Sequence, residues 1–284
     1  MASINLLELE DILWKALPEP RVGVHTVVVP LLAPTSLEQA KLWSVSHWPT
    51  VYKKSNPFGP HPSIISRAEE EVIKDLGIWM DMAARAAMGS KAMGYGEAIG
   101  AVIVWRGRQT SHAVALAGDG RWKGYELDGI GNPMAHAVLR AIGMVAQKLK
   151  YEEKNYSGQS NHAQDQDIFL DCPIMPQEQA IYESSQVPSN SYLCHGLEIY
   201  TTHEPCVACS MALLHSRFAR VIFGQRMPQT GGLCGEMCTV HQDSRKYNSL
   251  GYGLFWRKEL NWSFLAWQTE VKHTGLDIDL VVHA

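Results

Sequence analysis

The sequence predicts an α/β fold in three layers, with a mixed central sheet that carries helices on both faces. From residue 66 onward the expected elements run helix, strand, strand, helix, strand, helix and strand, an alternation typical of such sheets. Residues 98–105 form a nearly unbroken apolar run, as expected for a strand buried on both faces. Two groups of candidate metal ligands each follow a predicted strand, so one edge of the sheet can bring them together.

The first part of the chain is expected to form a small α/β segment. Apolar residues at helical spacing predict helices over residues 5–17 and 36–47, and β-branched residues predict a strand over 24–29. Prolines and a glycine mark residues 55–63 as a linker. These elements are too few to bury a core of their own. We therefore expect this segment, residues 1–62, either to pack on the rest or to be a trimmed form of a longer domain.

The rest of the chain, residues 63–284, is expected to form one larger domain. Periodicity and turn residues predict a long helix over 66–89, strands over 98–105, 111–117, 197–202 and 220–224, and helices from near His136 to 150 and over 208–218. Asn132 and Pro133 are expected to begin the first of the two later helices, as its N-cap and first residue. Residues 151–190 are polar and acidic and have no periodicity, so we expect a mobile surface insertion there.

Composition excludes several classes of protein. The chain has 284 residues of which 46% are apolar, and no apolar run reaches the length of a membrane span. The first residues lack a cationic stretch before an apolar block, so no secretory signal is expected. Six cysteines are too few for a disulfide scaffold in a chain of this length, which indicates a reducing compartment.

Charge gives no positive support for nucleic-acid binding. The formal net charge is −4, and residues 151–190 alone carry −6, which leaves the remainder at +2. A nearly neutral body with an acidic insertion can bind RNA locally, but a binding surface is not evident from composition. The cations that we single out as candidate RNA-binding residues are Lys53, Lys54 and Arg217.

The strongest local signal is a pair of cysteines at the start of a predicted helix. Cys206 and Cys209 follow a strand and are three residues apart, so both thiols can face one point at a helix N-terminus. His136, near the start of another helix, is the best candidate for a third ligand. Two thiolates and an imidazole suit zinc. A redox Cys-x-x-Cys is the alternative, but the preceding Glu204-Pro205 and the upstream histidine favour the metal.

The residue two positions after the histidine decides the functional interpretation. Zinc-dependent nucleobase deaminases carry the pattern His-x-Glu followed by Pro-Cys-x-x-Cys, in which the glutamate moves protons between water and the base. This chain has the ligands His136, Cys206 and Cys209 but places Val138 where the glutamate belongs. Valine cannot carry a proton, so no catalytic residue is assigned and the chain alone is predicted to be inactive.

The chain resembles a zinc-dependent deaminase of the cytidine deaminase superfamily over residues 66–267. More narrowly, it is similar to the auxiliary subunit of the eukaryotic heterodimeric tRNA adenosine deaminase, which converts the wobble adenosine of the anticodon to inosine. Four features carry the resemblance: His136-Ala137-Val138, the stretch 202–217 around the cysteines, Leu260-Asn261 before an aromatic cluster, and Trp48-Pro49 after a strand and a helix.

The resemblance implies a cytidine-deaminase-like fold, bound Zn²⁺, and a role as the non-catalytic subunit of a heterodimer. It further implies a catalytic deaminase subunit and tRNA as partners, no membrane association, and a location in the nucleus and cytoplasm. In that family the N-terminal domain contributes to RNA binding and is usually longer than residues 1–62. The subunit is expected to supply a dimer interface and a tRNA-binding surface.

Two alternative functions and one ligand remain open. The chain could be an active nucleoside or nucleotide deaminase that uses a displaced carboxylate such as Glu204, or a zinc-stabilised interaction module. Structural zinc sites usually have four protein ligands, and only three are evident. We expect the C-terminal tail to fold back, so that His283 or the terminal carboxylate fills the fourth position and blocks the pocket. Cys234 and Cys238 are a weaker candidate for a second metal pair.

Overall fold

The fold is known from a computed structural model of the chain. It describes residues 12–16, 26–30, 34, 37–51, 60, 62–107, 110–124, 131–157, 171–185, 187, 192–234, 252–257, 260–271 and 273–284.

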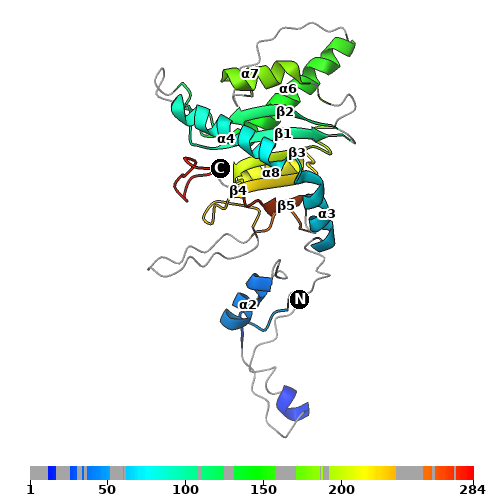
Figure 1. Ribbon diagram of the computed structural model, residues 1–284. Coiled ribbons are helices and arrows are strands. Elements are labelled where there is room, and N and C mark those ends of the chain that lie inside the picture. The colour runs from blue at the N-terminus through cyan, green and yellow to red at the C-terminus, as the bar shows by residue number, and fades with distance from the viewer. Residues whose placement is uncertain are drawn as a thin grey trace.

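A five-stranded mixed sheet forms the centre of the molecule (Figure 1). Its strands are β1 (Gly100–Arg106), β2 (Ser111–Gly118), β3 (Glu198–His203), β4 (Arg220–Gln225) and β5 (Leu265–Gln268), in the order β2-β1-β3-β4-β5. β1 pairs antiparallel with both β2 and β3, whereas β3, β4 and β5 are parallel. The predicted mixed sheet is therefore confirmed.

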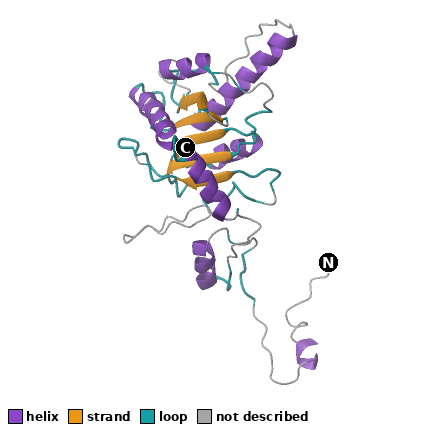
Figure 2. Ribbon diagram, turned by 45° about the vertical axis from the view of Figure 1, so that its right-hand side comes forward, coloured by secondary structure: helices purple, strands orange, loops and turns teal. Residues whose placement is uncertain are grey.

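Helices cover both faces of this sheet, which gives the three layers expected from the sequence (Figure 2). α6 (Ala137–Ser157) and α8 (Val207–His215) bury one face in a core that includes Val138, Cys209 and Leu213. α4 (Leu76–Ala92) covers the other face, with α7 (Pro176–Ser184) beside it near β2. Within the described residues no helix has the length and apolar character needed to cross a membrane.

The helix predicted over residues 66–89 is two helices with a break between them. α3 (Pro62–Val72) begins within the stretch predicted to be a linker, and α4 begins at Leu76. At the break, the Asp75 carboxylate accepts hydrogen bonds from the Arg106 guanidinium at 2.8 and 3.0 Å and from the Ser111 hydroxyl at 2.5 Å. These hydrogen bonds connect Asp75 to the end of β1 and the start of β2, and so they fix the break between the helices. The periodicity of the sequence does not predict such long-range contacts.

The insertion predicted over residues 151–190 is also partly wrong. α6 continues to Ser157, and α7 lies inside the predicted insertion; residues 158–170 lie outside the described residues. α7 is anchored by a fully buried ion pair between Glu178 and Arg140 of α6, with nitrogen–oxygen distances of 2.9 Å. Glu178 is one of the acidic residues that led to the prediction of a surface insertion, yet its side chain is buried.

The N-terminal elements are only partly as predicted. α2 (Leu37–Ser46) confirms the helix expected over 36–47, and residues 12–16 are helical within the helix expected over 5–17. Residues 26–30 form no strand, and Val28 is 74% exposed. β-branched residues favour a strand only where a neighbouring strand completes the hydrogen bonds, and none pairs with residues 26–30 in the described structure.

Candidate metal centre

The loop after β2 delivers His136 to the start of α6. Asn132 does not cap this helix as expected: its side-chain oxygen accepts a hydrogen bond from the Met134 backbone N–H at 3.1 Å and closes a turn. The helix begins at Ala137, and the His136 carbonyl accepts its first bond, from the Arg140 N–H. His136 thus occupies the N-cap position, and the residue is 6% exposed.

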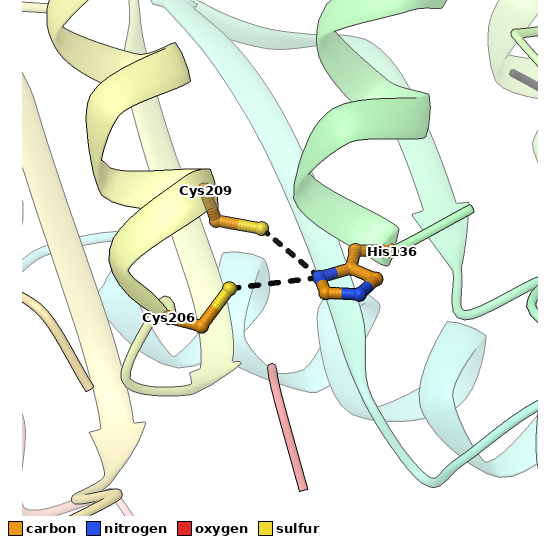
Figure 3. Close-up of side chains that lie close together, drawn as sticks. All are labelled: His136, Cys206 and Cys209. Carbon is orange, nitrogen blue, oxygen red and sulfur yellow. Dashed lines mark hydrogen bonds between the residues drawn. The ribbon is translucent and has the colours of Figure 1, made fainter. Parts of the chain in front are cut away.

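The cysteine pair is held at the opposite helix start. β3 is buried along its whole length and ends at His203, and α8 begins at Val207 with Cys206 in the extended N-cap conformation. Cys209 lies on the first turn of α8 and is fully buried. Because β3 is central in the sheet, the chain turns from strand to helix at a fixed place, and both sulfur atoms face α6 (Figure 3).

The three side chains form one compact group. His136 Nδ1 lies 3.3 Å from Cys209 Sγ and 3.6 Å from Cys206 Sγ, and all three ligand atoms are within 4.8 Å of one another. A tetrahedral zinc ion with Zn–S near 2.3 Å and Zn–N near 2.0 Å separates sulfur from nitrogen by about 3.5 Å. The spacing and the donor types therefore fit zinc.

The two thiols of the pair share a hydrogen bond and shift in opposite directions: the hydrogen bond with Cys206, together with complete burial, raises the pKa of Cys209. A hydrogen bond from the Cys209 thiol lowers the pKa of Cys206 to about 4, with a smaller lowering from His136, and these outweigh the opposing effect of burial. The Cys206 sulfur is therefore a thiolate at neutral pH, which is the form that binds metals.

Val138 is part of the hydrophobic core. It is 1% exposed and belongs to the apolar cluster between the sheet and the helices α6 and α8. At this position, two residues after the histidine, the chain offers no group that can accept or donate a proton. The site has the metal-ligand set, and valine replaces the glutamate of the deaminase pattern at position 138.

Glu204, the alternative base considered from the sequence, has a structural role. Its carboxylate accepts hydrogen bonds from the backbone N–H groups of Met227, Leu233 and Cys234 at 3.1, 3.1 and 2.8 Å. A Cβ atom at Gly231 would lie only 2.3 Å from this carboxylate. The carboxylate therefore fastens the loop after β4 and is not part of the metal-ligand group.

The C-terminal tail reaches the group, but His283 does not join it. The Ala284 oxygen accepts a hydrogen bond from the Cys206 backbone N–H at 2.8 Å, and Ala284 is 1% exposed. The tail runs next to the group (Figure 3). The His283 residue is exposed, and its carbonyl accepts a hydrogen bond from Arg121. The His283 side chain is therefore not part of the metal-ligand group in this structure, and the expected fourth ligand, His283 or the terminal carboxylate, stays a prediction.

Arg121 is a residue of this region that sequence reasoning missed. Its guanidinium binds the buried Asp119 carboxylate at 2.7 Å and also holds the tail at His283. The Thr230 hydroxyl donates to the Val282 carbonyl at 2.8 Å and makes a second attachment. These contacts join positions far apart in the chain, so no local sequence motif predicts them.

Of the three candidate RNA-binding residues, Arg217 alone lies in the described part of the chain. Lys53 and Lys54 lie outside the described residues, as does Cys238. Arg217 has a positive φ of 66°, donates to the Asn261 carbonyl at 3.0 Å and lies 5.1 Å from the centre of the Trp262 ring. These contacts give Arg217 a packing role against the chain's own C-terminal part.

Comparison with known proteins identifies relatives of the chain. It is 29% identical over 248 residues to "tRNA-specific adenosine deaminase subunit tad3" of Schizosaccharomyces pombe, covering 86% of this chain and 59% of that protein. The corresponding protein of Saccharomyces cerevisiae, with the same description, is 27% identical, covering 73% of this chain and 51% of that protein. "Probable inactive tRNA-specific adenosine deaminase-like protein 3" of Rattus norvegicus is 28% identical, covering 81% and 62%.

The chain thus spans between 51% and 62% of the length of these curated relatives. A family model described as "Cytidine and deoxycytidylate deaminase zinc-binding region" matches residues 74–225. This match covers more than half of the chain and includes His136, Cys206 and Cys209. The chain therefore belongs to the cytidine and deoxycytidylate deaminase zinc-binding family and has its three-layer fold.

Proposed function

We propose that this chain is the non-catalytic subunit of a tRNA-specific adenosine deaminase that converts wobble adenosine to inosine. One observation carries the proposal: the His/Cys/Cys group is complete, and Val138 stands where the proton-carrying glutamate belongs. The relatives named as subunits of tRNA-specific adenosine deaminases, and those named as probably inactive, support the same role.

In this proposal zinc is held by His136, Cys206 and Cys209 and has a structural role. Bound there, it would link the start of α6 to the start of α8, which are the two helices that bury one face of the sheet. Glu204 keeps the loop after β4 in place. The tail, fixed by Arg121 and Thr230, covers the group at Ala284. Each of these residues holds the surroundings of the group in place, and in this proposal none of them moves a proton.

A catalytic partner with an intact His-x-Glu sequence is part of the proposal, because general acid–base catalysis contributes about 10²–10⁴-fold to such reactions. The partner would carry the chemistry, and this chain would supply a dimer interface and part of the tRNA-binding surface. The three backbone contacts of Glu204 speak against the alternative of an active nucleoside deaminase.

The test is reconstitution. The chain is purified alone and together with a His-x-Glu deaminase subunit from the same source, and inosine is measured at the first anticodon position of tRNA. We expect inosine from the pair and none from this chain alone. As a control, replacing the glutamate in the partner's His-x-Glu sequence must abolish the product. Inosine made by the solitary chain would refute the assignment, and a pair that forms without editing tRNA would favour an interaction module.

A second expectation concerns the substitution Val138→Glu, which restores the missing carboxyl group. We expect no measurable deamination by this variant, because position 138 is 1% exposed in an apolar core and the tail covers the adjacent group. Deamination of adenosine, cytidine and tRNA is followed by ammonia release. Val138→Gln is the matched control, since glutamine has nearly the same shape but cannot carry a proton. Turnover by Val138→Glu clearly above that of Val138→Gln would contradict the view that the tail and the apolar core close off this position.

A further inference from the structure

Three consecutive residues of the C-terminal tail run next to the metal-ligand group (Figure 3) and form a strap: Val282, His283 and Ala284. Each of them accepts a hydrogen bond at its backbone carbonyl, and each bond comes from a different part of the chain. The donors are, in that order, the Thr230 hydroxyl at 2.8 Å, the Arg121 guanidinium at 2.5 Å and the Cys206 backbone N–H at 2.8 Å. Ala284 is 1% exposed, so the strap excludes solvent beside Cys206.

Two of these bonds belong to the cysteine side of the metal-ligand group. Cys206 is the N-cap residue of α8, and its own backbone N–H holds Ala284. The Cys206 backbone also forms an isolated β-bridge with Gly231, the residue that follows Thr230. Thr230 is therefore fixed to the start of α8, and through its hydroxyl it fixes Val282 to the same place. Both attachments tie the strap to the element that carries the cysteines.

The third bond comes from the histidine side. The Arg121 backbone carbonyl accepts a hydrogen bond from the Asn132 N–H at 2.8 Å, and the neighbouring Gly120 N–H donates to the Ala135 carbonyl at 2.8 Å. These two bonds hold residues 120–121 against the segment that ends at His136. Arg121 therefore contacts the segment before His136 with its backbone and the strap with its side chain. The strap thus connects the two elements that supply the metal ligands.

A buried carboxylate fixes the direction of the Arg121 side chain. The Asp119 carboxylate accepts hydrogen bonds from Arg121 Nε at 2.9 and 3.1 Å and from Nη2 at 2.7 Å. Asp119 is itself fully buried, and its backbone is held by Ile99 and by the Ser90 hydroxyl. Bidentate arginine–carboxylate pairs are strong and directional. Arg121 Nη2 carries two protons, so one is bound by Asp119 and the other is directed at the His283 carbonyl.

We propose that Arg121 is a positioning residue of the metal centre: oriented by Asp119, it fastens the strap to the histidine side and thereby slows the loss of zinc. A metal ion held by two separate elements leaves when these elements move apart or when a competing ligand reaches it. The strap opposes both events, because it joins the two elements and covers Cys206 at Ala284. The proposal rests on the zinc of the proposed function and adds a residue that controls its exchange.

The test replaces Arg121 with methionine, which keeps an apolar stem and removes every donor. The rate at which bound zinc passes to the chelator 4-(2-pyridylazo)resorcinol is measured on the purified full chain. We expect this rate to rise about tenfold or more, since partners outside the ligand shell typically change metal affinity by 10–100-fold. Backbone hydrogen exchange should also become faster in peptides that contain Cys206 or Val282. Thr230→Val, which removes the second attachment at nearly constant shape, should change both measurements in the same direction.

Arg220→Met is the matched control. The Arg220 side chain is 19% exposed, close to the 15% of Arg121, and it also pairs with a buried carboxylate, that of Glu198, at 2.8 Å. Its second partner is Glu71 of α3, so it joins β4 to α3 and not to the strap. We expect this control to lose stability but to release zinc within about twofold of the wild-type rate. All chains are compared below their melting temperatures, with circular dichroism as the check of folding.

Zinc release at the wild-type rate in folded Arg121→Met would overturn the proposal, and so would an equal acceleration in Arg220→Met. If Arg121→Met does not fold, Thr230→Val decides, and an unchanged rate in that variant would overturn the proposal. A wild-type chain purified without zinc would refute both the strap and the structural zinc. Inosine formation by the reconstituted pair is measured separately: if the wild-type pair edits tRNA while the strap variants keep their zinc, the strap fails and the proposed function stands.

Discussion

Replacing Cys209 with alanine is expected to remove zinc from the chain and to lower its melting temperature by about 10 °C or more. Cys209 is fully buried between α8 and α6, and its sulfur lies 3.3 Å from His136 Nδ1. Structural zinc sites bind with apparent free energies of about 10–16 kcal/mol, and this energy supports folding. The variant loses the third ligand, and Cys206 loses the hydrogen bond that lowers the pKa of its thiol.

The measurements are zinc content by mass spectrometry and thermal unfolding. Cys194→Ala is the matched control, because Cys194 is also a buried free cysteine but lies outside the metal-ligand group. We expect that control to retain one zinc per chain and to lose only the small packing contribution of one sulfur atom. Full zinc content in Cys209→Ala would reject the assigned ligand set. An equal loss of stability in both variants would reduce the role of Cys209 to packing.

The group of His136, Cys206 and Cys209 could be predicted from the sequence because each part of it lies in a short motif at the start of a helix. The spacing of Cys206 and Cys209 after a strand places both sulfurs at one helix start, and the three-layer alternation brings His136 to the same region. The apolar run of β1 identified a central strand, because a strand buried on both faces has no polar side. β3 is buried along its whole length although its sequence, EIYTTH, is largely polar, so its central place could not be predicted in this way.

Features that depend on distant partners could not be predicted. The break before α4 is held by Asp75 and Arg106, and the start of α6 is shifted by the turn that Asn132 closes. The position of the tail depends on Arg121 and Thr230. Each contact joins polar groups whose relation appears only once the sheet has formed. The periodicity of apolar residues predicts which face of a helix or strand is buried. It does not predict which charged residue of another element will pair with a given side chain.

Removing the buried carboxylate of α7 by Glu178→Ala is expected to destabilise the domain by about 3–5 kcal/mol. Glu178 and Arg140 are both fully buried, and their charges pair through two hydrogen bonds of 2.9 Å. The Glu178 carboxylate also accepts from the Gly118 and Ile174 backbone N–H groups at 2.7 Å. Without it, the Arg140 charge stays in the interior without its carboxylate, although the Gly118 and Cys172 carbonyls still accept hydrogen bonds from it.

Denaturant unfolding measures this effect, and two further variants locate its cause. Glu183→Ala removes an exposed glutamate of the same helix, which pairs only with Gln179 in the contacts described, and should change the free energy of unfolding by less than about 0.5 kcal/mol. The double replacement Arg140→Met with Glu178→Met takes away both charges. It should be less destabilising than Glu178→Ala alone, because the main cost of the single change is an unpaired buried charge. If the double variant is the less stable of the two, the backbone contacts of the carboxylate, and not the ion pair, hold α7 against the sheet.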